Sequence, residues 1–292
     1  MDTAHATSEQ FAAYLDNLAE GNTSQIAGFF GPQSITWEID REAILFFGSF
    51  RALLMQIAHP KVAQGVKDHS RFKEEPYARL VATFQAVHSM IFGDRPTAIA
   101  AAKQVHAVHM RIQGHLEDPV PGVADPTYFA NDPELLIWVY ATLMDTSIVT
   151  HELFFQPRPR SEWDSFYQES KVFAQLFGID PAHLPATLSD FEAWMQSTLE
   201  SDTITITPTA REVANAIIYP GGLLKILSPL NYLLAVGTLP PTLGDQFGLR
   251  WMPGMRESFD FIAHSARNLA PKLPQEFRWV PAARAAYSRC AN

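Results

Sequence analysis

The spacing of apolar residues is the feature that most constrains the fold of this chain. Apolar side chains recur three or four residues apart along almost the whole sequence, as expected for helices with one buried face. Strict alternation, which is typical of half-buried strands, is almost absent. Residues 202–208, DTITITP, form the clearest extended candidate. The pattern predicts an all-α domain with a buried multi-helix centre.

Prolines and glycines delimit several of these segments. Pro76 and Pro96 lie where the first turns of two helices are expected, and Gly93 and Gly114 lie at their predicted C-terminal ends. Residues 21–40 and 116–131 are predicted loops, and the C-terminal tail is predicted to be irregular. The predicted helices are 8–20, 41–60, 75–94, 95–114, 132–155, 160–178, 187–200, 209–218, 221–238, 240–247 and 254–269.

Composition limits the function further. Apolar residues make up 47% of the 292 residues, enough for a large core that contains a cavity. The net charge of −9 gives no electrostatic reason to bind nucleic acid or an anionic membrane. The single cysteine, Cys290, can form neither an intramolecular disulfide nor a cysteine-based zinc site. Neither a secretory signal nor a transmembrane segment is recognised, so we expect a cytoplasmic protein.

Two histidines stand three residues apart in the segment AAKQVHAVHMRIQG, residues 101–114. His109 shares a helix face with the small residues Ala98 and Ala102, which leave room for a large flat group. His106 is rotated from it by about 60° and is expected to be more exposed. Three interpretations compete: hydrogen-bonded core histidines, a non-haem metal site, or an axial haem ligand.

The surrounding residues favour the haem. A di-iron site in a helix bundle needs several carboxylates and Glu-x-x-His pairs, but the His106 helix has no acidic residue between Asp94 and Glu117. The zinc motif His-Glu-x-x-His and the hydrolase motif Gly-x-Ser-x-Gly are absent as well. A haem requires one protein ligand and an apolar slot. Arg79 and Thr83 share a helix face, and on spacing alone a surface ion pair is the simplest role for Arg79.

Several segments, taken in order, resemble the rubber oxygenases, which comprise latex-clearing proteins and mpaB-type oxygenases. The resemblance spans about residues 41–251 and implies a globin-like all-α fold around a b-type haem. Characterised members use dioxygen to cleave carbon–carbon double bonds in isoprenoid chains. The segments are QIAHPKVAQGVKDHSRF (56–72), RLVAT (79–83), FGD (92–94), VHAVHMRIQG (105–114), DPELLIWVYATLMDT (132–146), LFGID (176–180) and LPPTLGDQFGLRW (239–251).

The resemblance assigns roles to individual residues. His109 begins a His-x-x-x-x-Gly motif that ends at Gly114, which implies that His109 is the axial ligand of the haem iron. Arg79 and Thr83 match the distal catalytic residues, and this role replaces the surface ion pair. Latex-clearing proteins carry a lysine immediately before that threonine, where this chain has Ala82. The lysine-ligated closed state is therefore not expected here.

Further residues are candidates for holding the haem. The second ring nitrogen of His109 needs an acceptor, and Asp145 is a candidate. His59 is a cofactor-binding candidate that the dipole of the preceding helix would favour when it is protonated. A structural role is the simpler reading for both His59 and His69. The basic residues considered for the haem propionates are Arg51, Lys61 and Arg111.

Together these observations predict an iron-containing haem b oxygenase that acts with dioxygen on a small, unsaturated, isoprenoid or lipid-like substrate. A haem peroxidase or peroxygenase and a non-enzymatic haem sensor or carrier are the alternatives. We expect an N-terminal helix and loop at 1–40, the catalytic domain at 41–251, and a C-terminal helix and tail at 252–292 packed on the same domain. No nucleic-acid partner is expected.

Overall fold

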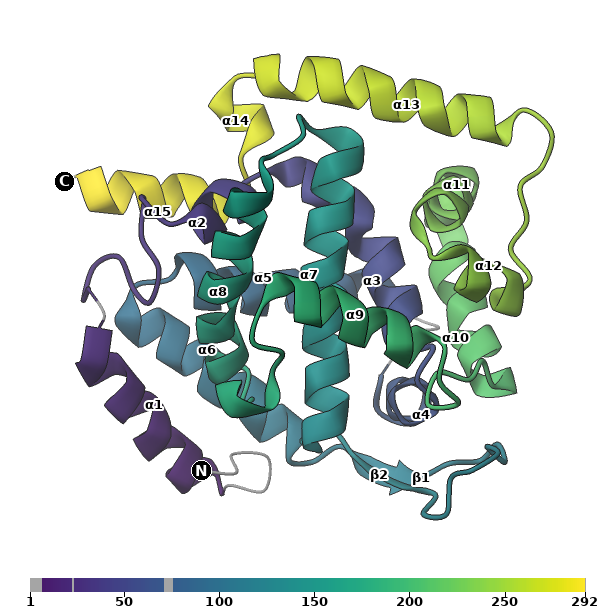
Figure 1. The fold of residues 1–292 in the computed structure, drawn as a ribbon, viewed down its shortest axis with the longest axis horizontal. Coiled ribbons are helices and arrows are strands. Elements are labelled where there is room, and N and C mark those ends of the chain that lie inside the picture. The colour runs from purple at the N-terminus through teal and green to yellow at the C-terminus, as the bar shows by residue number, and fades with distance from the viewer. Residues whose placement is uncertain (1–6, 23, 71–75, 292) are drawn as a thin grey trace.

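A computed structural model describes residues 7–22, 24–70 and 76–291, without the side chains of residues 21–22 and 76–80. The described part is built from helices, which confirms the predicted all-α multi-helix domain (Figure 1). Its one small sheet pairs β1 (Gln113–His115) with β2 (Thr127–Phe129) in antiparallel fashion, with Gly114 opposite Tyr128. This hairpin lies at one edge of the molecule.

Most predicted helices are present, with ends shifted by a few residues. The remaining described elements are α1 (Ser8–Asn22), α2 (Ile35–Asp40), η1 (Ala43–Gly48), α3 (Ser49–Gln56), α4 (Pro60–His69), α5 (Pro76–Phe92), α6 (Arg95–His109), α7 (Pro133–Phe154), α8 (Arg160–Leu176), η2 (Pro181–His183), α9 (Leu188–Leu199), α10 (Pro208–Ile218), η3 (Gly222–Leu227), α11 (Ser228–Thr238), α12 (Pro241–Phe247), α13 (Met255–Leu269), η4 (Ala270–Lys272), α14 (Gln275–Arg278) and α15 (Pro281–Ala291).

Helix α7 is the centre of the domain (Figure 1). It packs against η1, α3, α8 and α13, and its apolar residues are buried on several sides. The polar atoms of two of its large side chains form hydrogen bonds with neighbouring helices. Trp138 Nε1 donates to the Met55 carbonyl at 3.1 Å, and the Tyr140 hydroxyl lies 2.6 Å from Ser170 Oγ. These bonds attach α7 to its neighbours α3 and α8, as buried aromatic residues with polar ends require.

Helices α5 and α6 form the hairpin that carries the predicted site residues. Asp94 caps α6, because its Oδ1 accepts a hydrogen bond from the Thr97 backbone nitrogen at 2.9 Å. Gly93 has no room for a side chain, since a Cβ there would lie 2.2 Å from the Ser89 carbonyl oxygen. These local signals lie in the sequence, which is why both helices could be predicted.

The segment at 21–60 differs from the prediction in two ways. Residues 35–40 are helical, because Ser34 caps α2 and Trp37 anchors it by donating from Nε1 to the Ile91 carbonyl at 2.7 Å. The single helix predicted at 41–60 is divided into η1 and α3. At their junction Gly48 lies against α7, where a Cβ would be 2.2 Å from Thr150 Oγ1. Close packing of one helix on another decides both features.

Two other predictions are wrong. Residues 202–208 form no strand: the Thr205 backbone nitrogen donates to the Ala58 carbonyl instead of to a partner strand. The tail is helical rather than irregular, since α15 packs on α5 and buries Ala283 and Ala286 completely. In both segments, contacts with distant residues outweigh the local pattern.

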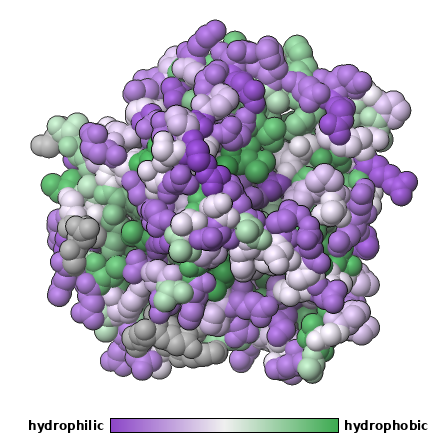
Figure 2. All heavy atoms as spheres, in the orientation of Figure 1, coloured by the Kyte–Doolittle hydropathy of each residue, from purple (hydrophilic) through white to green (hydrophobic). Residues whose placement is uncertain are grey.

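Hydrophilic residues cover most of the face shown in Figure 2, with smaller hydrophobic areas between them. Among the described residues, no single helix combines the length and apolar character needed to cross a bilayer. Two sharply bent helix pairs, one over residues 43–69 and one over residues 208–238, reach that length and composition only when each pair is counted together.

Candidate functional site

An apolar cavity of about 310 Å³ lies between α5 and the central helices. Its wall is formed by side chains from α2, η1, α3, α5, α7 and α8, and by the start of α15. Most of them are hydrophobic, including the aromatic residues Phe46, Phe84 and Phe173. The volume is at the lower end of the range of about 300–1,000 Å³ that is usual for small-molecule pockets. The cavity therefore suits a small hydrophobic ligand.

A few polar side chains interrupt this wall. Thr83 and His88 come from α5, Thr146 from α7 and Asp40 from α2. The His88 ring contacts the Phe84 and Phe92 rings at 5.5 and 5.8 Å between centroids. Burial lowers the pKa of His88 to about 4, so this imidazole is neutral at neutral pH. A mainly apolar pocket with a few polar groups is typical of a substrate site.

The structure places one of the two predicted catalytic residues. Thr83 lines the cavity, and so does His88, which follows it by five residues on the same helix. The cavity extends around more than one face of α5, which explains why both residues reach it. The Arg79 side chain lies outside the described residues, so its catalytic role stays a prediction.

The two histidines of α6 have different surroundings from those expected. His109 ends the helix and is half-buried, with its ring edge against Phe177 at 5.6 Å. His106 is only 4% exposed and stacks on Phe11 of α1 at 4.3 Å. The expectation that His106 is the more exposed of the two is wrong, because α1 covers this face of α6. Burial lowers the pKa of His106. His109 is not among the described wall residues of the cavity.

Asp145 has a partner other than the one expected. Its carboxylate forms an ion pair with Arg51, and Arg51 also donates to the Thr238 carbonyl. The predicted contact between Asp145 and His109 is absent from the described structure. Arg51 is buried, and a buried guanidinium needs anionic or polar partners. Asp145 and Thr238 supply these partners, so the pair joins α3 to α7 and α11.

The other cofactor-binding candidates do not line the described cavity. His59 is buried, and its Nδ1 accepts a hydrogen bond from the Lys61 backbone nitrogen at 3.2 Å, which caps α4. Burial, together with the charge of Lys61, lowers the pKa of His59 to about 4. His59 lies at the N-terminus of α4 and not at the C-terminus of the preceding helix, as the sequence had suggested, and it has a capping role there. His69 contacts the Gln113 carbonyl at 3.1 Å, and Arg111 is exposed.

Sequence analysis missed Asp40, which lies in a segment predicted to be a loop. Asp40 is the last residue of α2, is half-buried and lines the cavity. Burial raises the pKa of this carboxyl group to about 7. Part of the residue stays accessible because it faces the cavity, while protein atoms surround it. No motif marks this position, since the cavity wall comes from segments far apart in the chain.

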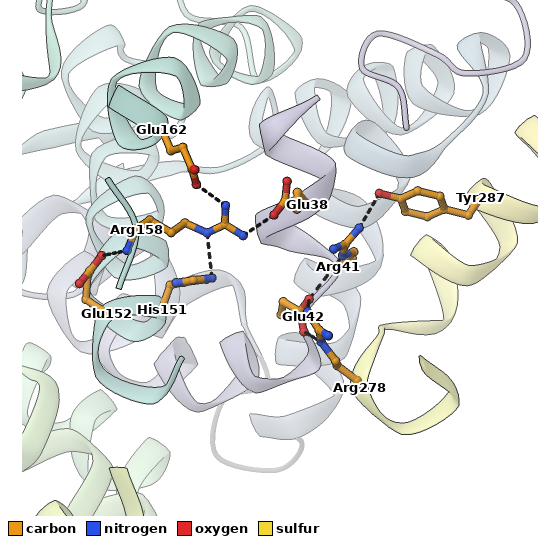
Figure 3. Close-up of polar contacts among 9 residues, drawn as sticks. All are labelled: Glu38, Arg41, Glu42, His151, Glu152, Arg158, Glu162, Arg278 and Tyr287. Atoms are coloured by element: carbon orange, nitrogen blue, oxygen red, sulfur yellow. Dashed lines mark hydrogen bonds and ion pairs between the residues drawn. The ribbon is translucent and has the colours of Figure 1, made fainter. Parts of the chain in front are cut away.

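Two residues after Asp40 in the sequence, Glu42 also lines the cavity but is fully paired (Figure 3). Its two carboxylate oxygens each accept a bond of 2.7 Å from Arg278. Arg41 approaches the same carboxylate at 3.4 Å and donates to the Tyr287 hydroxyl at 2.9 Å. These contacts attach the C-terminal segment to the cavity wall and neutralise the charge of Glu42.

A second group of charged residues braces the far side of α2 (Figure 3). Arg158 donates to Glu38 and to Glu162, both at 2.6 Å, and its Nε donates to His151 Nε2 at 3.3 Å. Burial, and then the charge of Arg158, lower the pKa of His151 to about 3. His151 is therefore a neutral acceptor in this group, which holds α2 against α7 and α8.

Comparison with known families decides what kind of protein this is. The family described as "ER-bound oxygenase mpaB/B'/Rubber oxygenase, catalytic domain" matches residues 36–268, from α2 to α13. The chain belongs to this family. Its family name indicates oxygenase activity, and with it an oxidoreductase.

Two curated relatives of this mpaB/rubber oxygenase family member come from mycobacteria. The uncharacterized protein Rv2237 of Mycobacterium tuberculosis is 25% identical over 238 residues, which cover 78% of this chain and 89% of the relative. The uncharacterized protein Mb2261 of Mycobacterium bovis matches with the same identity and coverage. No solved structure matches the chain.

The described residues of this mpaB/rubber oxygenase family member include one imidazole that could hold a haem iron. Within the described residues, no three side chains of His, Cys, Asp or Glu converge as ligands for a metal ion. A haem iron needs one imidazole and an apolar slot. His109 at the end of α6 offers the imidazole, whereas the small residues Ala98 and Ala102 on the same helix are covered by protein atoms and do not line the described cavity.

Asp40 makes stability depend on pH in a direction opposite to most carboxylates. Its folded pKa of about 7 lies above its ordinary value, so between pH 4 and 7 the folded protein binds the extra proton. Stability contributed by this group therefore falls as the pH rises through that window. We expect Asp40→Asn to be more stable than wild type by roughly 2–4 kcal/mol at pH 8, and little different at pH 4.5.

Urea unfolding of both proteins at the two pH values measures this difference. His88 titrates in the opposite sense, but it is present in both proteins and cancels, and Glu42 stays paired with Arg278. An Asp40→Asn protein that gains no stability relative to wild type between pH 4.5 and 8 would contradict the assignment.

Proposed function

We propose that this family member is a b-type haem-dependent oxygenase that uses dioxygen to oxidise an unsaturated hydrophobic substrate. Family membership supports the oxygenase activity. The observation that carries the substrate class is the cavity, whose wall is apolar and aromatic and includes the predicted catalytic residue Thr83. A chain of carbon atoms with a double bond would bury well against such a wall, because the removal of apolar surface from water is favourable.

His109 would hold the haem, which when bound supplies the activation of dioxygen. The imidazole is on a rigid helix end and its ring is oriented by the edge contact with Phe177. His59, Arg51 and Asp145 are held by bonds within the protein, so they support the frame around the site. Ala82 has no group that could bind a metal, in keeping with an accessible site beside Thr83.

The wall residues would prepare the substrate for reaction. Phe84 and Phe173 would hold the apolar part of the substrate and exclude water from it. Thr83 is exposed at the edge of the apolar cavity, where its hydroxyl would act as the donor or acceptor of one hydrogen bond to a developing charge. His88 is neutral and so does not add a charge to this apolar surface.

Thr83→Val tests the catalytic role of the hydroxyl, because valine has nearly the same shape without the polar atom. We expect turnover to fall by about 30-fold, which corresponds to roughly 2 kcal/mol of transition-state stabilisation. Haem content and melting temperature should stay near those of wild type. Thr198→Val is the matched control, since the Thr198 hydroxyl bonds the Trp194 carbonyl on α9, outside the cavity wall.

Two measurements test the proposed function itself. The absorption spectrum of the purified or haem-reconstituted protein should show a bound b-type haem. Oxygen consumption should then rise when unsaturated hydrocarbons are added, and hydrogen peroxide should not replace dioxygen. A protein that cannot be loaded with haem, or one that oxidises substrates only with peroxide, would disprove this proposal.

A further inference from the structure

One acid in the cavity wall has no partner within the protein. Among the described wall residues the acids are Asp40 and Glu42, and Glu42 is paired with Arg278 and Arg41. The Asp40 carboxyl group forms no hydrogen bond or ion pair with another residue that the structure describes, and burial is the cause of its raised pKa. Because Asp40 is half-buried and lines the cavity, its carboxyl group is available to a ligand bound there.

Three hydroxyl groups in the same wall already donate hydrogen bonds within the protein. Thr36 Oγ1 donates to Glu169 at 2.8 Å, Ser49 Oγ to the Phe46 carbonyl at 2.7 Å, and Ser170 Oγ to the Tyr167 carbonyl at 2.7 Å. The protein therefore satisfies several hydroxyl groups around Asp40 and leaves the carboxyl group itself directed to the cavity. A ligand in the cavity is the partner that remains.

We propose that Asp40 binds the hydroxyl group of a small unsaturated alcohol whose hydrocarbon part fills the cavity. An unsaturated alcohol would then be the substrate class of the proposed oxygenase. This inference rests on the proposed function, because that function makes the cavity the substrate site. The apolar wall would bind the chain, and one hydrogen bond at Asp40 would fix which end of the chain lies against α2.

The charges around the cavity favour a neutral alcohol over other polar end groups. A carboxylate would lie near two acids, Asp40 and Glu42, with the basic partners of Glu42 already engaged. An ammonium group would lose its hydration in an apolar cavity. A hydroxyl group donates to an ionised carboxylate and accepts from a protonated one. It therefore matches Asp40 on both sides of its raised pKa, and of the other titratable wall residues Glu42 is paired with Arg278 and His88 is neutral.

Four ligands with the same ten-carbon skeleton test the proposal by calorimetric titration: geraniol, geranyl methyl ether, geranylamine and geranic acid. The protein is used as purified, with its haem content recorded, so binding is measured independently of turnover. We expect wild type to bind geraniol about tenfold more tightly than the ether, because the ether lacks the hydroxyl donor. The amine and the acid should bind more weakly than geraniol.

Variants at the cavity wall assign the preference to Asp40. Asp40→Leu should bind geraniol and the ether equally, whereas Asp40→Asn, whose amide donates and accepts, should keep a preference for geraniol. Ser147→Ala removes another polar group from the wall and should keep the full preference. Melting temperatures check that each variant is folded.

Several outcomes would overturn the proposal. These are equal binding of geraniol and ether by wild type, tighter binding of the amine or the acid, no binding of any of the four, or equal loss of the preference in Ser147→Ala. If the preference for geraniol holds but no oxygen is consumed, the proposed oxygenase function fails while the alcohol site stands.

Discussion

Replacing His109 by alanine should remove most of the haem from the protein or change its absorption spectrum markedly. We propose His109 as the axial ligand from its resemblance to the family motif, and it ends α6 beside Phe177. Loss of the one protein–iron bond should lower haem retention by at least tenfold, because the apolar slot alone supplies no ligand to the iron. The haem content of the purified variant and its spectrum measure this directly.

The control variant at His106 must fill the space of this buried side chain. Truncation of this residue to alanine would leave a cavity against Phe11 and destabilise the domain. His106→Leu fills the space, and it also removes two ring nitrogens that lack hydrogen-bond partners within the described residues. We therefore expect this variant to keep its haem and to be at least as stable as wild type.

Chemical rescue separates ligation from folding. His109→Gly should regain a haem spectrum when imidazole is added, since free imidazole can supply the missing nitrogen. Equal loss of haem from the His109 and His106 variants would refute the assignment, and so would a His109→Ala protein with an unchanged spectrum.

Glu42→Ala should lower the free energy of unfolding by about 3 kcal/mol. This is the largest loss of stability that we expect from breaking one buried ion pair. Glu42 is 2% exposed and accepts two bonds from Arg278, so its removal leaves that guanidinium without its partner. The loss would also release α14 from η1, and Val280 and Pro281, which follow α14, line the cavity.

Urea denaturation of matched variants isolates this effect. Glu192→Ala removes a carboxylate that pairs with Arg160 while both side chains are 50% exposed, and it should cost less than about 1 kcal/mol. The double variant Glu42→Ala with Arg278→Ala should be more stable than the sum of the two single losses, because neither charge is left alone. A Glu42→Ala protein within 1 kcal/mol of wild type would contradict the role of this pair.

Local signals in the sequence account for much of the helical framework. Asp94, Pro96 and the glycine at 93 lie within one turn of the α5–α6 connection, so they could be recognised without knowledge of distant residues. The same holds for the central helix α7, where Pro133 begins a long apolar segment. Family-like motifs likewise directed attention to Thr83, which the structure places in a cavity wall.

Burial and pairing could not be predicted in the same way, since they depend on residues far apart in the chain. Arg51 meets Asp145 across 94 positions, and Glu42 meets Arg278 across 236. His106 is buried because α1 covers it, which no pattern within α6 indicates.

The sequence by itself determined that this protein is all-α, where most of its helices lie, and which family it resembles, because caps, prolines and apolar spacing act over a few residues. Only the tertiary structure decided which polar groups are paired and which face a cavity. Asp40 shows the difference: its neighbours in the chain suggest a loop, but packing of α2 against α5 and α7 encloses its carboxyl group. Enclosure by distant segments is what sets its charge and its availability to a ligand.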